Sequence, residues 1–191
     1  MQSEIVRLIS KYLPLSDKDA QIVTDCIPVK NFKKGAILLR EGQISCESYI
    51  IFKGLVRKYY LDDGEEKTSE FYTENEAVSS PQSYNKKIPA NHYIECIEDC
   101  RLAVLTYDKE QELIKKVPGY ETLCRVSIEE ELGAQQEKLA KFTMSLPEKR
   151  YLDLLENRPN LLQRVPQYFL ASYLGVKPES LSRIRKRIST K

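Results

Sequence analysis

Residues 167–186 have the sequence Gln-Tyr-Phe-Leu-Ala-Ser-Tyr-Leu-Gly-Val-Lys-Pro-Glu-Ser-Leu-Ser-Arg-Ile-Arg-Lys, and this stretch decides the fold of the C-terminal part. A helix-turn-helix needs a small residue where its two helices cross, and Ala171 has the right size and place. Four residues later the turn needs a backbone that tolerates a positive φ, which Gly175 provides. Pro178 fits the first turn of a second helix, where its missing N–H costs nothing. The segment therefore predicts a helix-turn-helix.

Apolar side chains occupy the positions that fill the wedge between two such helices. The predicted core of the motif consists of these residues together with the small ones: Leu170, Ala171, Leu174, Gly175, Val176, Leu181 and Ile184. An ordinary helical hairpin is the alternative, but it does not require all of these constraints within twenty residues.

The second helix of this motif has two different faces. At 100° per residue, Leu181, Ile184 and Ile188 form one apolar stripe, and charged residues lie opposite. Since the first turns of a recognition helix enter the major groove, the polar residues there are candidates for base contacts. Arginine can donate two hydrogen bonds to guanine, and glutamate can accept one from the cytosine amino group. The predicted base contacts are Glu179, Ser180, Ser182 and Arg183.

Positive charge is concentrated at the C-terminal end. The net charge of the chain is +2, but residues 164–191 carry seven basic residues and one acid, which leaves about −4 for residues 1–163. Clustered cations of this kind suit a polyanion, because each can neutralise a phosphate. A solvated basic terminus is the simpler alternative. The predicted phosphate contacts are Lys177, Arg185, Lys186, Arg187 and Lys191. Lys177 also stands where a Ser or Thr helix cap would be expected.

The N-terminal two thirds predict short strands. Runs rich in β-branched and aromatic residues alternate with glycine-containing turns, of which Asp63-Gly64 is the strongest hairpin signal. The predicted strands are Ala36–Leu39, Tyr49–Phe52, Val56–Leu61, Thr68–Tyr72, Tyr93–Ile97 and Leu102–Leu105. Strands at intervals near ten residues indicate an antiparallel sandwich or roll. Short helices are expected before it, with Ser16 as a helix cap.

A long helix is predicted from Gly119 to Met144. Five of its residues step by 4, 3, 4 and 3, which is the spacing of a coiled-coil seam: Ile128, Leu132, Gln135, Leu139 and Phe142. A helix lying on its own domain would look similar, since two heptads are few. The predicted divisions are a sensor domain at 1–118, a dimerisation helix at 119–144 and a DNA-binding domain at 145–191.

On these motifs the chain resembles the cyclic-AMP receptor protein/FNR (Crp/Fnr) family. The likeness includes the glycine-punctuated roll, the long helix, Leu170-Ala-Ser-Tyr-Leu-Gly and Pro178-Glu-Ser-Leu-Ser-Arg. It implies an α+β fold: a cyclic-nucleotide-binding-like β-roll (a double-stranded β-helix), a long dimerisation helix and a winged-helix-like helix-turn-helix. The implied function is a homodimeric transcription regulator on a near-palindromic duplex DNA site, with RNA polymerase as a further candidate partner.

The sequence departs from the cyclic-AMP-binding members. They carry a Gly-Glu-Leu-type turn followed by an arginine and a small hydroxyl residue, but here the stretch is Glu76-Ala-Val-Ser-Ser-Pro-Gln-Ser-Tyr, with Ala90-Asn91 near the arginine position. No arginine occurs between Arg57 and Arg101, and a buried phosphate without a cation is poorly stabilised. We expect no cyclic AMP binding; the effector is unknown. The N-terminal cysteine cluster of the iron–sulfur members is missing.

The remaining composition limits other functions. The chain is 41% hydrophobic and 30% charged, and no apolar run approaches the length of a membrane span, so a cytoplasmic location without membrane contact is expected. One histidine, no phosphate-binding glycine loop and no nucleophile motif argue against an enzyme and against a metal site. The five cysteines, without a C-x-x-C pair, predict free and mostly buried thiols.

Two alternatives stay open at the level of sequence. His92, Cys96 and Cys100 are spaced by four, would share a face of one strand, and could give a thiol- or redox-responsive regulator. The chain could also be a protein-interaction module that does not bind DNA, although the basic C-terminal end argues against that.

Overall fold

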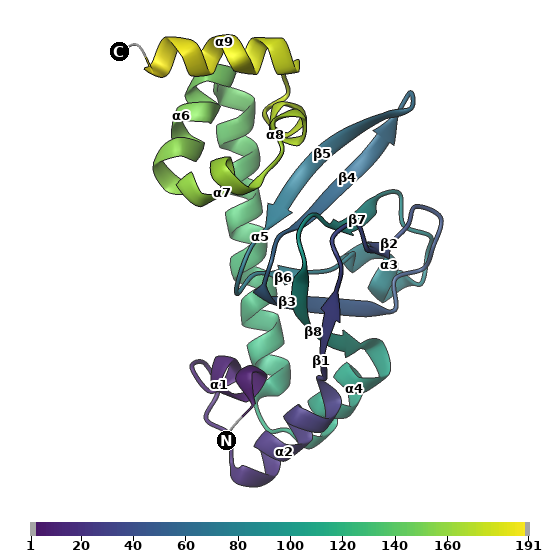
Figure 1. The fold of residues 1–191 in the computed structure, drawn as a ribbon. Coiled ribbons are helices and arrows are strands. Elements are labelled where there is room, and N and C mark those ends of the chain that lie inside the picture. Colours follow the sequence, from purple (N-terminus) through teal and green to yellow (C-terminus); the bar gives the residue numbers. More distant parts are fainter. Residues whose placement is uncertain (1–2, 190–191) are drawn as a thin grey trace. The chain divides into compact units, whose positions relative to one another are not determined.

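The structure, a computed structural model, describes residues 3–189 (Figure 1). Within this range the strands are β1 Val29–Phe32, β2 Ile37–Leu39, β3 Glu47–Lys53, β4 Val56–Asp62, β5 Glu65–Tyr72, β6 Ala77–Val78, β7 Tyr93–Cys96 and β8 Cys100–Thr106. The helices are α1 Glu4–Ile9, α2 Asp17–Cys26, α3 Pro81–Lys86, α4 Tyr107–Lys116, α5 Tyr120–Met144, α6 Pro147–Asn157, α7 Pro159–Arg164, α8 Gln167–Leu174 and α9 Pro178–Ser189. The expected α+β fold class is confirmed.

The strands form two four-stranded sheets. One has the order β1-β8-β3-β6 and the other β2-β7-β4-β5. In the first sheet β8 pairs antiparallel with β1 and β3, with Val29 opposite Ala103 and Ile50 opposite the same residue. Neighbours distant in sequence are typical of a roll, because the chain crosses between the sheets instead of forming successive hairpins within one.

The six predicted strands are all present, within a few residues of their expected ends. The hairpin turn between β4 and β5 is also confirmed, since Asp63 and Gly64 have φ values of 49° and 79°. Two positive φ angles in succession are the mark of a type I′ turn, which matches the twist of the flanking strands. The sequence did not predict β1, whose first three residues are exposed, or the two-residue strand β6.

Local capping explains where two of the helices begin. Ser16 accepts a hydrogen bond from the Asp19 N–H (3.2 Å), and the Asp19 carboxylate accepts one from the Ser16 N–H, so α2 starts with the expected capping box. Thr106 likewise accepts from the Lys109 N–H at the start of α4. Gly119, with a φ of 83°, separates α4 from α5.

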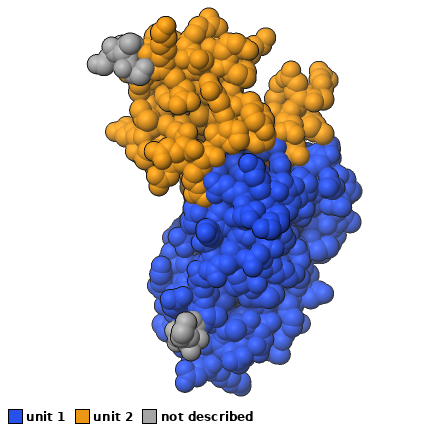
Figure 2. Space-filling model, in the orientation of Figure 1, with its two compact units in different colours: residues 1–57, 71–131 blue, residues 58–70, 132–191 orange. Residues whose placement is uncertain are grey.

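The chain forms two compact units, which are coloured separately in Figure 2. Unit 1 comprises residues 1–57 and 71–131, and unit 2 comprises residues 58–70 and 132–191. The helix α5 contributes to both. The division into three domains at 1–118, 119–144 and 145–191 stays a prediction.

Unit 1 has two apolar cores. The first lies inside the roll and consists of Leu39, Tyr49, Ile51, Val56, Val78, Ala90, Ile94, Cys96, Cys100, Leu102 and Val104. The second joins the N-terminal helices to α4 and the start of α5 through Ile5, Val6, Ile9, Val23, Cys26, Ile27, Ala103, Leu113, Val117 and Tyr120. Ala103 and Leu102 alternate between these cores because successive side chains of β8 point to opposite faces of the sheet.

Unit 2 contains the C-terminal helices. Between residues 145 and 189 the chain forms α6 to α9 and no strand, so the strands of a winged helix are not found in that range. Its core is made of Tyr151, Leu154, Leu161, Val165, Phe169, Leu170, Ala171, Leu174, Leu181 and Ile184.

Candidate nucleic-acid interface

The segment 167–189 forms two helices joined by a tight turn. Gly175 ends α8 with a φ of 70°, and α9 begins at Pro178. The Gly175 N–H donates to the Ser172 carbonyl and the Val176 N–H to the Ala171 carbonyl, each with an N–O distance of 3.0 Å. This is the Schellman pattern, in which a residue in the left-handed region ends a helix. The predicted helix-turn-helix is therefore the observed local structure.

The predicted core positions of the motif are largely buried. Ala171 and Leu181 are completely inaccessible, and Leu170, Leu174 and Ile184 are at most 5% exposed. Val176 is half-buried, and Gly175 lies exposed in the turn. Because Ala171 has no accessible surface, a larger side chain there would push the helices apart, as the sequence argument required.

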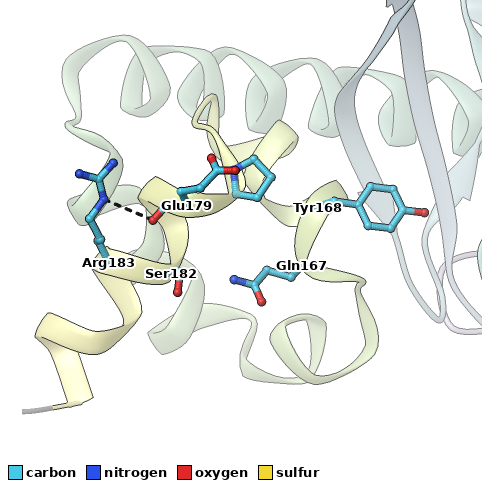
Figure 3. A pocket seen from close by; sticks show the side chains of 6 residues that line it. Gln167, Tyr168, Glu179, Ser182 and Arg183 are labelled. Atoms are coloured by element: carbon cyan, nitrogen blue, oxygen red, sulfur yellow. Dashed lines mark hydrogen bonds between the residues drawn. The ribbon is translucent and has the colours of Figure 1, made fainter.

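The predicted base-contact residues lie on the opposite face of α9. Glu179, Ser182 and Arg183 are exposed, and Ser180 is half-buried. Glu179, Ser182 and Arg183 line an open hollow on the surface of unit 2 (Figure 3). The Arg183 Nε lies 3.4 Å from the Glu179 carbonyl, and its Nη2 lies 3.4 Å from the Ser180 hydroxyl. Both distances are long for hydrogen bonds, so the guanidinium is only weakly held.

Two further residues of the same hollow were missed from the sequence. Gln167 and Tyr168, in the first turn of α8, line it together with Pro178 of α9. In Figure 3 the Gln167 side chain extends toward α9, whereas the Tyr168 ring points away from α9. Both belong to the exposed start of the first helix of the motif, directly after Pro166. Their position after Pro166 could have indicated an exposed first turn, but an uncharged amide and a phenol add no charge pattern that would predict a role in binding.

The described residues among the predicted phosphate contacts are all exposed. Lys177 precedes α9, and Arg185, Lys186 and Arg187 lie on its second half. Arg187 forms an ion pair with Glu148 of α6, with an Nη1–Oε2 distance of 3.2 Å. Lys191 lies outside the described residues.

The start of α9 is held by main-chain bonds. The Lys177 carbonyl accepts from the Ser180 N–H (3.0 Å) and the Leu181 N–H (3.1 Å). Lys177 has no side-chain oxygen to accept from the first-turn N–H groups, as noted from the sequence. The positive end of the helix dipole lies at the first turn of α9, which contains Glu179.

The predicted seam of α5 carries large apolar side chains that are mostly accessible in the single chain. The exposed fractions are 65% for Ile128, 58% for Leu132, 68% for Leu139 and 43% for Phe142, and Gln135 is also exposed. Phe142 is the least accessible of them because its ring packs against the guanidinium of Arg150, 3.7 Å from ring centroid to Cζ.

The turn-proximal part of the β4–β5 hairpin belongs to unit 2 and contacts α8. β5 is the last strand of its sheet, so one of its edges has no neighbouring strand. The Ser172 hydroxyl matches that edge: it accepts from the Thr68 N–H (2.9 Å) and donates to the Glu66 carbonyl (3.0 Å). Nearby, Lys138 of α5 forms an ion pair with the buried Glu70.

Lys138 also lies 5.3 Å from the centre of the Tyr173 ring. Burial acts to lower the pKa of Lys138, but Tyr173 and Glu70 outweigh it and raise the pKa above its ordinary value. This side chain stays charged at neutral pH and ties α5, the hairpin and α8 together within unit 2.

The cysteines of the roll differ from the expected arrangement. His92 precedes β7, Cys96 ends it, and Cys100 begins β8, so the prediction that the three share a face of one strand is wrong. Both thiols are buried and share a hydrogen bond. This bond and burial both raise the pKa of Cys96, whereas for Cys100 the same bond outweighs burial and lowers the pKa. All five cysteines are free; Cys26 is also buried, Cys124 is half-buried and Cys46 is exposed. Burial limits the access of an oxidant to Cys96 and Cys100.

Over residues 3–189 no group of three or more His, Cys, Asp or Glu side chains is arranged to hold a metal ion. Over the same residues no helix has both the length and the apolar character to cross a membrane.

Comparison with known proteins supports the architecture. Residues 29–117 match the family described as the cyclic nucleotide-binding domain. No curated protein matches the chain. Among solved structures, the c-di-GMP responsive global regulator CLP of Xanthomonas campestris has a TM-score of 0.71 at 17% identity, covering 92% of each chain.

Two further solved structures are similar over most of their length. FixK2 from Bradyrhizobium japonicum has a TM-score of 0.72 at 16% identity, covering 86% of this chain and 85% of that one. A transcriptional regulator of the Crp/Fnr family from Eubacterium rectale has a TM-score of 0.70 at 17% identity, covering 94% and 88%.

Residues 29–117, which form the two-sheet roll, therefore match the family described as the cyclic nucleotide-binding domain. Most of the chain, including its long helix and C-terminal helices, has the same fold as these three solved structures. The fold implied by the resemblance inferred from the sequence is confirmed.

Proposed function

We propose that the protein is a sequence-specific, DNA-binding transcription regulator. The observation that carries this proposal is the division of α9 into two faces. Leu181 and Ile184 are buried against the rest of the motif, and Glu179, Ser182 and Arg183 are exposed together in one hollow. A carboxylate close to DNA is repelled by the phosphates, which is unfavourable unless it accepts a hydrogen bond from a base or orients an arginine. The presence of Glu179 therefore favours base recognition over general polyanion binding.

The proposal includes a homodimer formed through α5. Three aliphatic side chains of the seam are more than half exposed in the single chain, and burying them against a second copy would remove that apolar surface from water. A two-fold dimer would present two α9 helices to successive turns of one DNA face, and a near-palindromic operator would then be bound. A cytoplasmic location and contact with RNA polymerase are part of the same proposal.

Selection of bound duplexes from random DNA tests the proposal directly. We expect enrichment of a sequence with two-fold symmetry, and the enriched duplex should bind about 10³-fold or more tightly than a scrambled duplex of equal composition. Fluorescence anisotropy over a salt series should show affinity falling steeply as salt rises, because phosphate contacts release counterions. Equal binding of enriched and scrambled duplexes would refute the proposal.

Cyclic AMP is not expected to be the effector. The hydroxyl of Ser83, in the stretch that stands in place of the Gly-Glu-Leu-type turn, donates to the Ile88 carbonyl (2.6 Å) and accepts from the Ser45 N–H (2.8 Å). Arg57, the buried arginine of the roll, is paired with Glu95 (Nη2–Oε2 2.6 Å). Its charge is thus already used by a carboxylate.

We therefore predict no measurable binding of cyclic AMP to the whole protein by titration calorimetry. The physical reason is that a cyclic phosphate buried in the roll would have no arginine left to neutralise it. A dissociation constant in the micromolar range or tighter would contradict this prediction and would leave the DNA-binding proposal untouched.

A further inference from the structure

Arg150, in the first turns of α6, contacts three separate segments of unit 2. Its Nη1 donates to the Leu174 carbonyl at the end of α8 (2.8 Å), and its Nε donates to the Ser145 carbonyl between α5 and α6 (3.0 Å). Its Cζ lies 3.7 Å from the centre of the Phe142 ring in the last turn of α5. One side chain thus connects the long helix, the segment after it and the turn of the helix-turn-helix.

The bond to Leu174 is of a favourable kind. In the Schellman turn the Ala171 and Ser172 carbonyls accept from the residues that follow α8, whereas the Leu174 carbonyl accepts from Arg150. A cationic donor at the carboxyl end of a helix also interacts favourably with the helix dipole. Arg150 therefore caps α8 from outside the motif.

The turn itself leaves space for this guanidinium. A Cβ atom added to Gly175 would lie 3.2 Å from the Arg150 Nη1 and 3.5 Å from the Phe142 Cζ. Glycine is thus favoured at this position for two reasons: its φ of 70° is unfavourable for other residues, and the arginine approaches the bare backbone closely. The second reason cannot be inferred from residues 167–186 alone.

The consequence concerns the recognition helix. Only Val176 and Lys177 lie between Gly175 and the start of α9. Because this connection is short, a displacement of the α8 end also displaces Glu179 and Arg183. The contact with Phe142 connects Arg150 to the last turn of α5, and Phe142 is the last residue of the proposed dimer seam.

We infer that Arg150 is a positioning residue for sequence recognition, which locks the turn of the helix-turn-helix to the end of α5. This inference rests on the proposed function and goes beyond it, because Arg150 itself contacts no base. It acts through the end of α8, and its role is to hold Glu179 and Arg183 at a fixed distance and orientation relative to α5. A loosened turn would still allow phosphate contacts, which tolerate changes in angle, but would weaken base contacts, which do not.

The test compares Arg150→Ala, Arg150→Lys and Arg150→Met with the control Lys149→Ala. Lys149 is an exposed neighbour on α6, so the control removes the same charge without a contact to the turn. Affinities for the enriched operator and for a scrambled duplex are measured by anisotropy at a temperature where circular dichroism shows every variant folded.

We expect Arg150→Ala to lose about tenfold or more of its operator affinity, the usual scale for a charge-assisted hydrogen bond. Its affinity for the scrambled duplex should change only as much as that of Lys149→Ala. Arg150→Met keeps an apolar contact with Phe142 but has no donor, so it should behave like Arg150→Ala. Arg150→Lys should recover only part of the affinity, because its ammonium group can donate to one of the two carbonyls but cannot reach both.

Hydrogen–deuterium exchange provides a second readout that needs no DNA. The N–H groups of Val176, Ser180 and Leu181, which are bonded across the turn and the start of α9, should exchange about tenfold faster in Arg150→Ala and at the wild-type rate in Lys149→Ala. Unchanged exchange would overturn the inference.

The remaining outcomes are also decisive. Equal operator binding by Arg150→Ala and Lys149→Ala would overturn the inference, and so would an equal loss on operator and scrambled duplex, which indicates a merely structural role. If the wild-type protein shows no preference for any duplex, the proposed function fails, and the exchange rates then decide by themselves whether Arg150 holds the turn.

Discussion

Replacing Leu132 by glutamate is expected to convert the protein to a monomer and to abolish tight operator binding. In the proposed two-fold seam, Leu132 of one copy lies against the same residue of the other, so the substitution places two carboxylates against each other in an apolar contact. Unpaired charges in such a position cost about 3 kcal/mol or more, which corresponds to at least about 100-fold in the dimer dissociation constant. In the single chain Leu132 is 58% exposed, so the fold of the monomer should be unaffected.

The effect on DNA binding should be larger than the effect on any single contact. Two linked recognition helices bind two half-sites as one event, and separating them removes an avidity of about 10²- to 10⁴-fold. Sedimentation equilibrium measures the association state, and anisotropy with the operator measures the affinity.

Ala134→Glu is the matched control for this experiment. Ala134 is exposed on α5 away from the predicted seam, and the substitution adds the same charge to the same helix. It should leave both the dimer and the operator affinity near wild type. A Leu132→Glu protein that remains dimeric would show that α5 does not form the subunit interface through this seam, although DNA binding by another assembly would still be open to measurement.

Arg183→Ala is expected to remove sequence preference at one base pair of each half-site. The Arg183 guanidinium is exposed and held only by two bonds of 3.4 Å, so it can turn toward a guanine without breaking a strong contact. A bidentate arginine–guanine pair contributes about 1–3 kcal/mol of discrimination, so the operator affinity should fall about 5- to 150-fold in each half-site. Competition with operators altered at single positions identifies the base pair concerned.

Arg185→Ala provides the contrast. Arg185 lies farther along α9 and is proposed to contact a phosphate, so its loss should weaken operator and scrambled duplex alike and lower the salt slope by about one. Arg183→Ala should instead leave the affinity for scrambled DNA nearly unchanged apart from its charge. If both variants lose affinity without any change in sequence preference, α9 does not contact the bases through Arg183.

The helix-turn-helix and most strands were predictable because their determinants are local. Ala171, Gly175 and Pro178 lie within eight residues of each other, and each is constrained by the backbone geometry of the motif itself. The Asp63-Gly64 turn is a similar case, since the two positive φ angles of its hairpin follow from the turn length. The strands around it are identified by residue type and by the turns at their ends.

The failures have the opposite origin. β1 and β6 are strands because β8 and β3 lie beside them, and four exposed or partly exposed residues such as those of β1 show no alternation in the sequence. His92, Cys96 and Cys100 have a regular spacing, but the chain leaves β7 after Cys96, so the spacing did not place them on one strand. Gln167 and Tyr168 line the same hollow as Glu179 and Arg183 because α8 crosses α9, which the sequence indicates only in general.

The amino-acid sequence by itself determined the α+β class, the helix-turn-helix, its buried and exposed faces and the apolar row on α5. These depend on periodicity and on backbone preferences that act over a few residues. Only the tertiary structure decided that the Ser172 hydroxyl hydrogen-bonds to the edge of β5 and that Arg150 contacts both the end of α5 and the Leu174 carbonyl. The Arg150–Leu174 and Ser172–Glu66 bonds join residues that lie 24 and 106 positions apart, and their formation depends on how whole helices and strands pack, which no local pattern encodes.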